Sequence, residues 1–191
     1  MACGRRHFVV QAAILTALAG CASPSPVLYT LAPVPGPAQP GGPKLVSVRE
    51  VSLARYLERS QIVRSSEGYQ LAVEANNWWG EPLGAMIGRV LEEELSQRLP
   101  GTTVIGDTSA IGGDPDAIVE TNILRFDADR AGTVVLRAQV AVTFPKSRRT
   151  PRMRSVRLTA PGATADIRGE VAAMSVVLGQ LADTIAGMLR A

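Results

Sequence analysis

The N-terminus constrains this chain most strongly, because it determines how much of the sequence remains to fold. A basic stretch at residues 5–7 is followed by an apolar run from Phe8 to Leu18, and small residues then precede Cys21. This order is the layout of a secretory signal peptide. A bilayer span needs about 20 apolar residues, so the run is too short to cross a membrane. The sequence therefore predicts that residues 1–20 are a signal peptide.

The residues at the predicted cleavage point are Leu18-Ala19-Gly20-Cys21, which is similar to the lipobox of bacterial lipoproteins. The resemblance implies cleavage before Cys21 and lipidation of its thiol. Two or three acyl chains would hold the protein in a membrane permanently, since each buried methylene contributes about 0.8 kcal/mol. An ordinary signal peptide with a chance cysteine and an uncleaved membrane anchor are the alternatives.

Cleavage would remove most of the catalytic chemistry. The single histidine is His7, and Cys3 is the only cysteine besides Cys21. A mature chain without imidazole or free thiol has no Ser-His-Asp or Cys-His catalysis, no imidazole or thiolate metal site and no internal disulfide. The Gly/Asp loop at 111–116 lacks the spacing of a calcium loop. We expect no metal, no cofactor and no enzymatic activity.

Charge gives no reason to expect a nucleic-acid partner. The whole chain has 20 Lys and Arg against 17 Asp and Glu, but residues 1–20 carry two arginines and no acid, which leaves 18 against 17. Such a nearly neutral body lacks the positive field of a nucleic-acid binder. The remaining length fits one domain.

A proline-rich segment precedes that domain. Seven of the 13 prolines lie between Ala22 and Pro43. Proline locks φ and lacks an N–H donor, so we expect residues 21–43 to be the lipidated cysteine and an extended tether. Residues 27–32 within it are a possible edge strand. Residues 44–191 are predicted to form a single domain.

Alternation and turn residues predict seven strands in that domain. Two pairs should be hairpins, one around a glycine-containing loop at 65–68 and one turning near 129–132. The predicted strands cover residues 44–51, 61–64, 69–73, 102–105, 117–127, 133–144 and 154–159.

Two amphipathic helices are also predicted. One is opened by Pro82 and stopped by Pro100-Gly101, and the other runs from an N-cap at Thr164 to about Leu189. The apolar stripe of the second helix favours packing on a sheet, with a coiled-coil partner as the alternative. The predicted fold class is α+β, with one mostly antiparallel sheet and two amphipathic helices packed on one face.

The order and spacing of several short motifs resemble one known family. The motifs are the lipobox, Tyr29-Thr30-Leu31-Ala32-Pro33, Val46-Ser47-Val48, Ala54-Arg55-Tyr56-Leu57-Glu58-Arg59, Gln61-Ile62-Val63, and Asn77-Trp78-Trp79-Gly80-Glu81-Pro82-Leu83 at the entry of the helix that ends at Pro100. With them the chain resembles the ABC-type transport auxiliary lipoproteins, the PqiC-like family. The carboxyl half matches by pattern only.

This resemblance implies a non-catalytic, periplasm-facing lipoprotein of an envelope lipid-transport system that supports membrane integrity. Its implied partners are an MCE-domain protein and the membrane components of that system. Because Ala22 rather than an aspartate follows Cys21, the lipoprotein sorting pattern implies the outer membrane. The alternative is a structural or assembly lipoprotein that does not contact lipid cargo. The sequence leaves a homo-oligomer open.

Trp78 and Trp79 are the two tryptophans of the chain and stand together at a helix entrance. Neighbouring residues on a strand point to opposite sides, so one ring should be core and the other should lie at the surface. An exposed tryptophan would suit contact with a partner or lipid. The alternative is that one ring packs beside Leu83 as a hydrophobic staple and the other lies on the surface without a binding role.

A basic segment places six cations between residues 146 and 157. Such a run is most often a solvated loop and strand face, but it would also suit anionic headgroups or an acidic partner. The candidate contact residues are Arg148, Arg149, Arg152 and Arg154.

Overall fold

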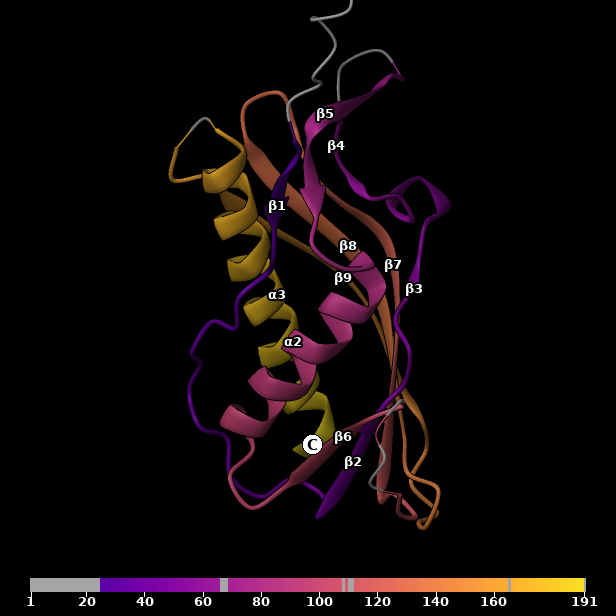
Figure 1. Cartoon of the computed structure of the whole chain (residues 1–191). Helices are drawn as coiled ribbons and strands as arrows, with labels where there is room; N and C mark the ends of the chain where they lie inside the picture. The colour runs from indigo at the N-terminus through magenta and orange to yellow at the C-terminus, as the bar shows by residue number, and fades with distance from the viewer. Residues whose placement is uncertain (1–24, 66–68, 108, 110–111, 165, 191) are drawn as a thin grey trace, which may run out of the picture.

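The computed structural model describes residues 25–65, 69–107, 109, 112–164 and 166–190 (Figure 1). Cys21 and the predicted signal peptide lie outside the described residues. The elements in chain order are β1 (Val27–Tyr29), β2 (Leu45–Val48), β3 (Ser52–Leu53), the 3₁₀ turn η2 (Arg55–Leu57), β4 (Gln61–Ser65), β5 (Leu71–Trp79), α2 (Leu83–Arg98), β6 (Thr103–Gly106), β7 (Ala117–Ala128), β8 (Thr133–Thr143), β9 (Arg152–Pro161) and α3 (Ile167–Arg190).

The larger sheet has the order β6-β2-β7-β8-β9, with β3 also paired to β7. The β7–β8 and β8–β9 pairings are antiparallel, whereas β2 runs parallel to both β6 and β7, and β3 runs parallel to β7. The predicted turn between β7 and β8 is confirmed. Asp129 Oδ1 accepts hydrogen bonds from the amides of Ala131 and Thr133, both over 2.9 Å, and Gly132 takes the positive φ that favours glycine.

A second sheet of three strands has the order β1-β5-β4. β4 and β5 form the predicted hairpin, and β1 is its parallel edge strand. The α+β class is confirmed, but the prediction of one mostly antiparallel sheet is wrong: there are two mixed sheets. Alternation reports which face of a strand is apolar and carries no information about the neighbouring strand.

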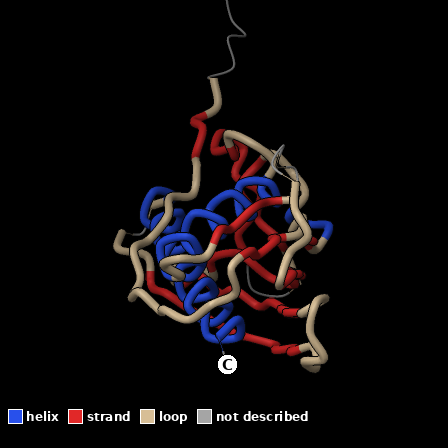
Figure 2. Tube along the Cα trace, turned by 90° about the horizontal axis from the view of Figure 1, so that it is seen from below, coloured by secondary structure: helices blue, strands red, loops and turns tan. Residues whose placement is uncertain are grey.

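The two helices lie on one face of the larger sheet and against each other, as Figure 2 shows from below. α3 packs on β7, β8 and β9, while α2 packs on β2 and β6. The predicted apolar stripe of α3 is buried from Val171 to Met188. This confirms the prediction that the stripe packs in the core, and not the alternative of a coiled-coil partner. Its N-cap side chain is Asp166 rather than Thr164, because Asp166 Oδ1 accepts the Gly169 amide over 2.9 Å.

The proline-rich segment contacts the helices, although the sequence predicts an extended tether. Leu31 is 2% exposed, and the Ala32 amide donates to the Ser175 hydroxyl of α3 over 3.1 Å. Further along, the Gln39 amide donates to the Arg98 carbonyl over 2.5 Å. We call residues 31–40 the strap. Proline excludes this segment from helices and strands, but side chains of the helices satisfy its backbone.

Candidate functional site

The β5–α2 corner holds the tryptophan pair. The Trp79 ring is 6% exposed in the core, and its amide donates to the Ser60 carbonyl over 2.7 Å. The Trp78 ring is only partly buried, and its Nε1 donates to the Ala75 carbonyl over 2.9 Å. The two rings therefore divide into one core and one surface side chain. The role of the surface ring in binding stays a prediction.

A cavity of about 710 Å³ opens beside this corner, between the chain at 50–60 and the chain at 79–85. Trp79 and Leu83 form part of its apolar lining. Its rim is charged, since Glu50, Glu58, Arg59 and Glu81 also line it, and Arg89 holds Glu81 in an ion pair of 2.6 Å. An apolar floor inside a charged rim is the anatomy of a protein-docking site.

The basic segment is split between structural and free side chains. The guanidinium groups of Arg149 and Arg152 lie 5.1 and 5.5 Å from the ring centre of Phe144, as cation–π contacts. Arg152 Nη1 also donates to the Met188 carbonyl in the last turn of α3, over 2.6 Å. Lys146 is paired with Asp116 over 3.2 Å.

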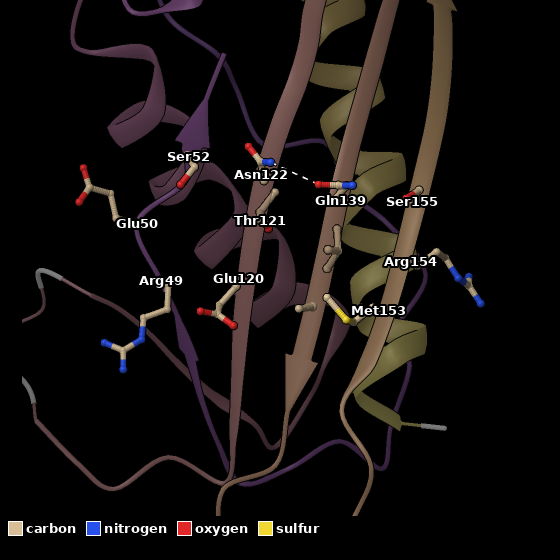
Figure 3. Close-up of a pocket in the computed structure, with 12 residues that line it drawn as sticks. Arg49, Glu50, Ser52, Glu120, Thr121, Asn122, Gln139, Met153, Arg154 and Ser155 are labelled. Atoms are coloured by element: carbon tan, nitrogen blue, oxygen red, sulfur yellow. Dashed lines mark hydrogen bonds between the residues drawn. The ribbon is translucent and has the colours of Figure 1, made fainter. Parts of the chain in front are cut away.

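Arg148 and Arg154 differ from these residues. Both are exposed, and neither side chain makes a hydrogen bond or ion pair within the part of the chain that the structure describes. Arg148 lies in the β8–β9 loop, while Arg154 lies on β9 at the border of the sheet-face groove described below, with its guanidinium directed away from the other lining residues (Figure 3). The four predicted arginines therefore divide into two with internal contacts and two without, and their role in binding stays a prediction.

A groove on the open face of the larger sheet was not predicted. It has a volume of about 390 Å³ and lies where β2 and β3 interrupt their pairing with β7 (Figure 3). Asn122 and Gln139 form its floor and share a hydrogen bond of 3.3 Å. Beside them Met153 is 83% exposed. The one sequence signal for this groove was the alternation of polar residues on β7 and β8, but that pattern predicts only a solvent-exposed sheet face and not a groove.

A buried ionic group fastens the strap to both helices. Arg98 is 1% exposed; its Nη1 donates to the Val34 carbonyl over 3.1 Å and its Nη2 to the Gly179 carbonyl over 3.1 Å. Gly36 is required here, since a Cβ at that position would overlap the guanidinium. Glu94 accepts the Val34 amide over 2.8 Å, and burial raises the pKa of Glu94 to about 7.

A second buried carboxylate joins the two sheets. Asp127 of β7 is 1% exposed and accepts hydrogen bonds from the Tyr56 hydroxyl over 2.6 Å and the Ser65 hydroxyl over 2.7 Å. Burial and the neighbouring Asp127 raise the pKa of Tyr56. The phenol therefore stays a donor, and the group is structural. Arg125 is also paired with Asp127, over 2.9 Å. Sequence patterning could not find the group, because Tyr56 and Ser65 lie 71 and 62 residues from Asp127 in the chain.

Among the described residues, no three His, Cys, Asp or Glu side chains gather as a metal site would require. Of the helices that the structure describes, α3 is long and apolar enough to cross a membrane, but 67% of that stretch is buried within the protein. Burial of this kind is typical of the core helix of a globular domain.

The fold matches solved structures over most of its length. One is the crystal structure of an uncharacterized protein, with a TM-score of 0.72, 19% identity, and 86% of this chain and 99% of that chain covered. Another is the crystal structure of a DUF330 protein from Xanthomonas campestris, with a TM-score of 0.70, 18% identity, and 86% and 94% covered. At these identities the likeness shows the fold alone. No curated protein matches the chain in sequence.

The sequence itself matches one family profile, described as the ABC-type transport auxiliary lipoprotein component, over residues 29–186. The match begins at the end of β1 and ends within α3, so it includes both sheets, both helices and the strap. This protein belongs to the family of ABC-type transport auxiliary lipoprotein components.

Proposed function

We propose that this protein is a non-catalytic subunit of an MCE/ABC-type envelope lipid-transport system, anchored through Cys21 in the outer membrane and facing the periplasm. The family supports the transport role. The lipobox and Ala22 support the anchor and its membrane. A non-catalytic role is supported by the absence of His and Cys from residues 25–191.

The observation that carries the proposal is that the N-terminal segment and the β8–β9 loop lie at opposite ends of the molecule. The described chain begins at Ser25, four residues after Cys21, at the end of the molecule that holds the small sheet (Figure 1). The β8–β9 loop lies at the other end. β8, with 11 residues, runs between the two ends and spans roughly 35 Å.

An anchor at Cys21 therefore favours an orientation with the β8–β9 loop away from the membrane. Arg148 at that end is exposed and without a partner among the described residues, so it would meet a protein rather than headgroups of the anchoring bilayer. The charged cavity at the β5–α2 corner offers a second contact. We assign the MCE-domain protein as the partner at these surfaces.

Cross-linking in native membranes tests this assignment. The wild type, Cys21→Ala and Arg148→Glu would be cross-linked and purified side by side, and the MCE-domain protein quantified. We expect it with the wild type, lost with Cys21→Ala and reduced with Arg148→Glu. Recovery of only other outer-membrane or cell-wall components with the wild type would overturn the transport role.

A structural or assembly lipoprotein that does not contact cargo is the second candidate. One observation favours it: three cavities among the described residues all have charged side chains in their lining. An acyl chain binds best in an apolar cavity. The test is to purify the protein without its lipid anchor and to look for bound hydrophobic cargo. Co-purified cargo would show direct contact with cargo, and its absence would favour the assembly role.

A further inference from the structure

The small sheet concentrates the exposed apolar side chains of this protein. Five of the eight exposed large hydrophobic residues in the described part of the chain lie on β1, at the start of β5 or just before it. Their exposure runs from 43% for Val73 to 109% for Tyr69. The set consists of Val27, Leu28, Tyr69, Leu71 and Val73. Such a concentration of apolar side chains in contact with water is typical of a surface that binds a partner or a membrane.

Charge is missing from the same stretches. Residues 25–43 and 69–73 contain no Asp, Glu, Lys or Arg. The next charged residue along β5, Glu74, is held by Arg64 at 3.8 Å. Arg64 of β4 stands opposite Ala72, and its guanidinium is also paired with Glu170 over 2.5 Å. The arginine beside the cluster is therefore neutralised by two carboxylates.

The strand register relates this cluster to Cys21. β1 runs parallel to β5, with Val27 opposite Asn77. Cys21 lies six residues before Val27, and Leu71 lies six residues before Asn77. Six residues reach at most roughly 20 Å, and six strand residues also span roughly 20 Å.

The anchor therefore cannot extend much beyond the start of β5. β1 and β5 run in the same direction (Figure 1). Measured along that direction, the distance from Val27 to the membrane that holds Cys21 cannot exceed the distance from Val27 to Leu71. The exposed apolar residues at the start of β5 reach the level of the anchoring bilayer.

We propose that the exposed apolar residues at and just before the start of β5 (Tyr69, Leu71 and Val73) rest in the interfacial region of the phospholipid bilayer that holds Cys21. The proposal depends on the lipid anchor in the proposed function. Tyrosine and aliphatic side chains suit the boundary between headgroups and acyl chains. β1 has an unpaired edge, which water and headgroups satisfy at that depth and hydrocarbon would not.

This contact would orient the whole protein. A single lipid anchor lets the body turn about the tether, whereas a second contact at the small sheet holds the long axis away from the bilayer. The β8–β9 loop and the groove on the open sheet face then point into the periplasm. The bilayer contact is thus the element that makes the distal docking surface available.

Site-specific fluorescence on the lipidated protein tests the contact. The predicted mature chain has no cysteine other than the lipidated one, so Leu71→Cys accepts a polarity-sensitive dye at a single site. The matched control is Met153→Cys, at an 83% exposed position on the open face of the other sheet. Both variants would be reconstituted into vesicles of phosphatidylethanolamine and phosphatidylglycerol, with circular dichroism to confirm their fold.

We expect a blue shift of the dye at position 71 and loss of most of its emission to a spin label carried on phospholipid. The dye at position 153 should keep its emission in water. Water-like, unquenched emission at 71 in protein that sediments with vesicles would overturn the bilayer contact and leave the transport role standing.

Two other outcomes would also overturn it. A blue shift without quenching, together with cross-links between copies, would assign the cluster to self-association. Failure of the wild type to sediment with vesicles would refute the anchor, and with it both this proposal and the location in the proposed function.

Discussion

Arg98 of α2 reaches Asp183 of α3, with 2.6 Å between Nε and Oδ1. The guanidinium is buried, while the Asp183 side chain is 41% exposed. The pair therefore joins the helices at their surface, while Nη1 of the same guanidinium holds the strap at the Val34 carbonyl and Nη2 donates to the Gly179 carbonyl of α3. A single arginine thus connects three segments that the sequence separates by more than 60 residues on either side.

Removal of that arginine should be costly. Arg98→Met leaves Glu94 buried without its neighbouring cation and the Val34 carbonyl without its donor, so we expect a loss of about 3–5 kcal/mol in the free energy of unfolding. Urea denaturation would measure it. Arg49→Met is the control, because the Arg49–Asp107 pair is exposed and worth only about 0.2–1 kcal/mol. Equal midpoints for the two variants would contradict this role.

Stability should depend on pH through Glu94. Burial raises its pKa from the ordinary 4.5 to about 7, so the folded state binds this proton more tightly than the unfolded state does. The associated stability is fully present below about pH 4.5 and is lost as the pH rises through 7, by about 3 kcal/mol.

The Glu94→Gln variant should therefore lose less stability between pH 5 and pH 8 than the wild type. Burial also raises the pKa of Glu170, but this carboxyl is common to both proteins and cancels in the comparison. Free energies of unfolding at the two pH values would test the difference. Parallel pH dependences in the two proteins would show that Glu94 does not titrate in this range.

The tryptophan pair should separate stability from binding. Trp79→Ala removes a core ring and should destabilise the fold by about 3–5 kcal/mol. Trp78→Ala should cost less than about 1 kcal/mol, because its ring is partly exposed. If Trp78 contacts the partner, this variant will lower the yield of cross-linked MCE-domain protein at unchanged stability. An unchanged yield would show that Trp78 does not contribute to binding of the partner.

Asp127 should determine how firmly the small sheet is held. Asp127→Ala removes the acceptor for Tyr56 and Ser65, at roughly 1.5–3 kcal/mol for hydrogen bonds to a charged group. Amide hydrogen exchange in β4 should accelerate more than exchange in β8, since β8 lies in the sheet that keeps its own pairing. Ser65→Ala, which removes one donor, should give a smaller effect. Uniform acceleration would indicate global destabilisation instead.

The basic segment should also divide by position. Arg152→Ala loses the hydrogen bond to the Met188 carbonyl and a cation–π contact, so we expect about 1–2 kcal/mol of destabilisation. Arg148→Ala should change stability by less than about 0.5 kcal/mol. Thermal unfolding would compare them. A larger effect at Arg148 than at Arg152 would reverse this assignment.

Local patterns predicted the hairpins and helices well. The β7–β8 turn and the buried stripe of α3 depend on residues close in the chain, and the structure confirms both. The groove on the open face and the Asp127 group were not predicted, because each brings together residues from distant strands. The tryptophans were placed correctly as one core and one surface ring, since adjacent strand residues must alternate.

The sequence by itself determined most of the strands, the two helices and which faces are apolar, because these follow from side-chain periodicity within a few residues. It missed β3, predicted a strand to 51 where β2 ends at Val48, and ended at 73 a strand that continues as β5 to Trp79. Only the tertiary structure decided that the strands divide between two sheets, that β2 and β3 run parallel to β7, and that the strap folds back onto the helices. A period of two specifies the face of a strand but not its neighbour. The strap is held by Glu94 and Arg98, whose burial no local pattern reports.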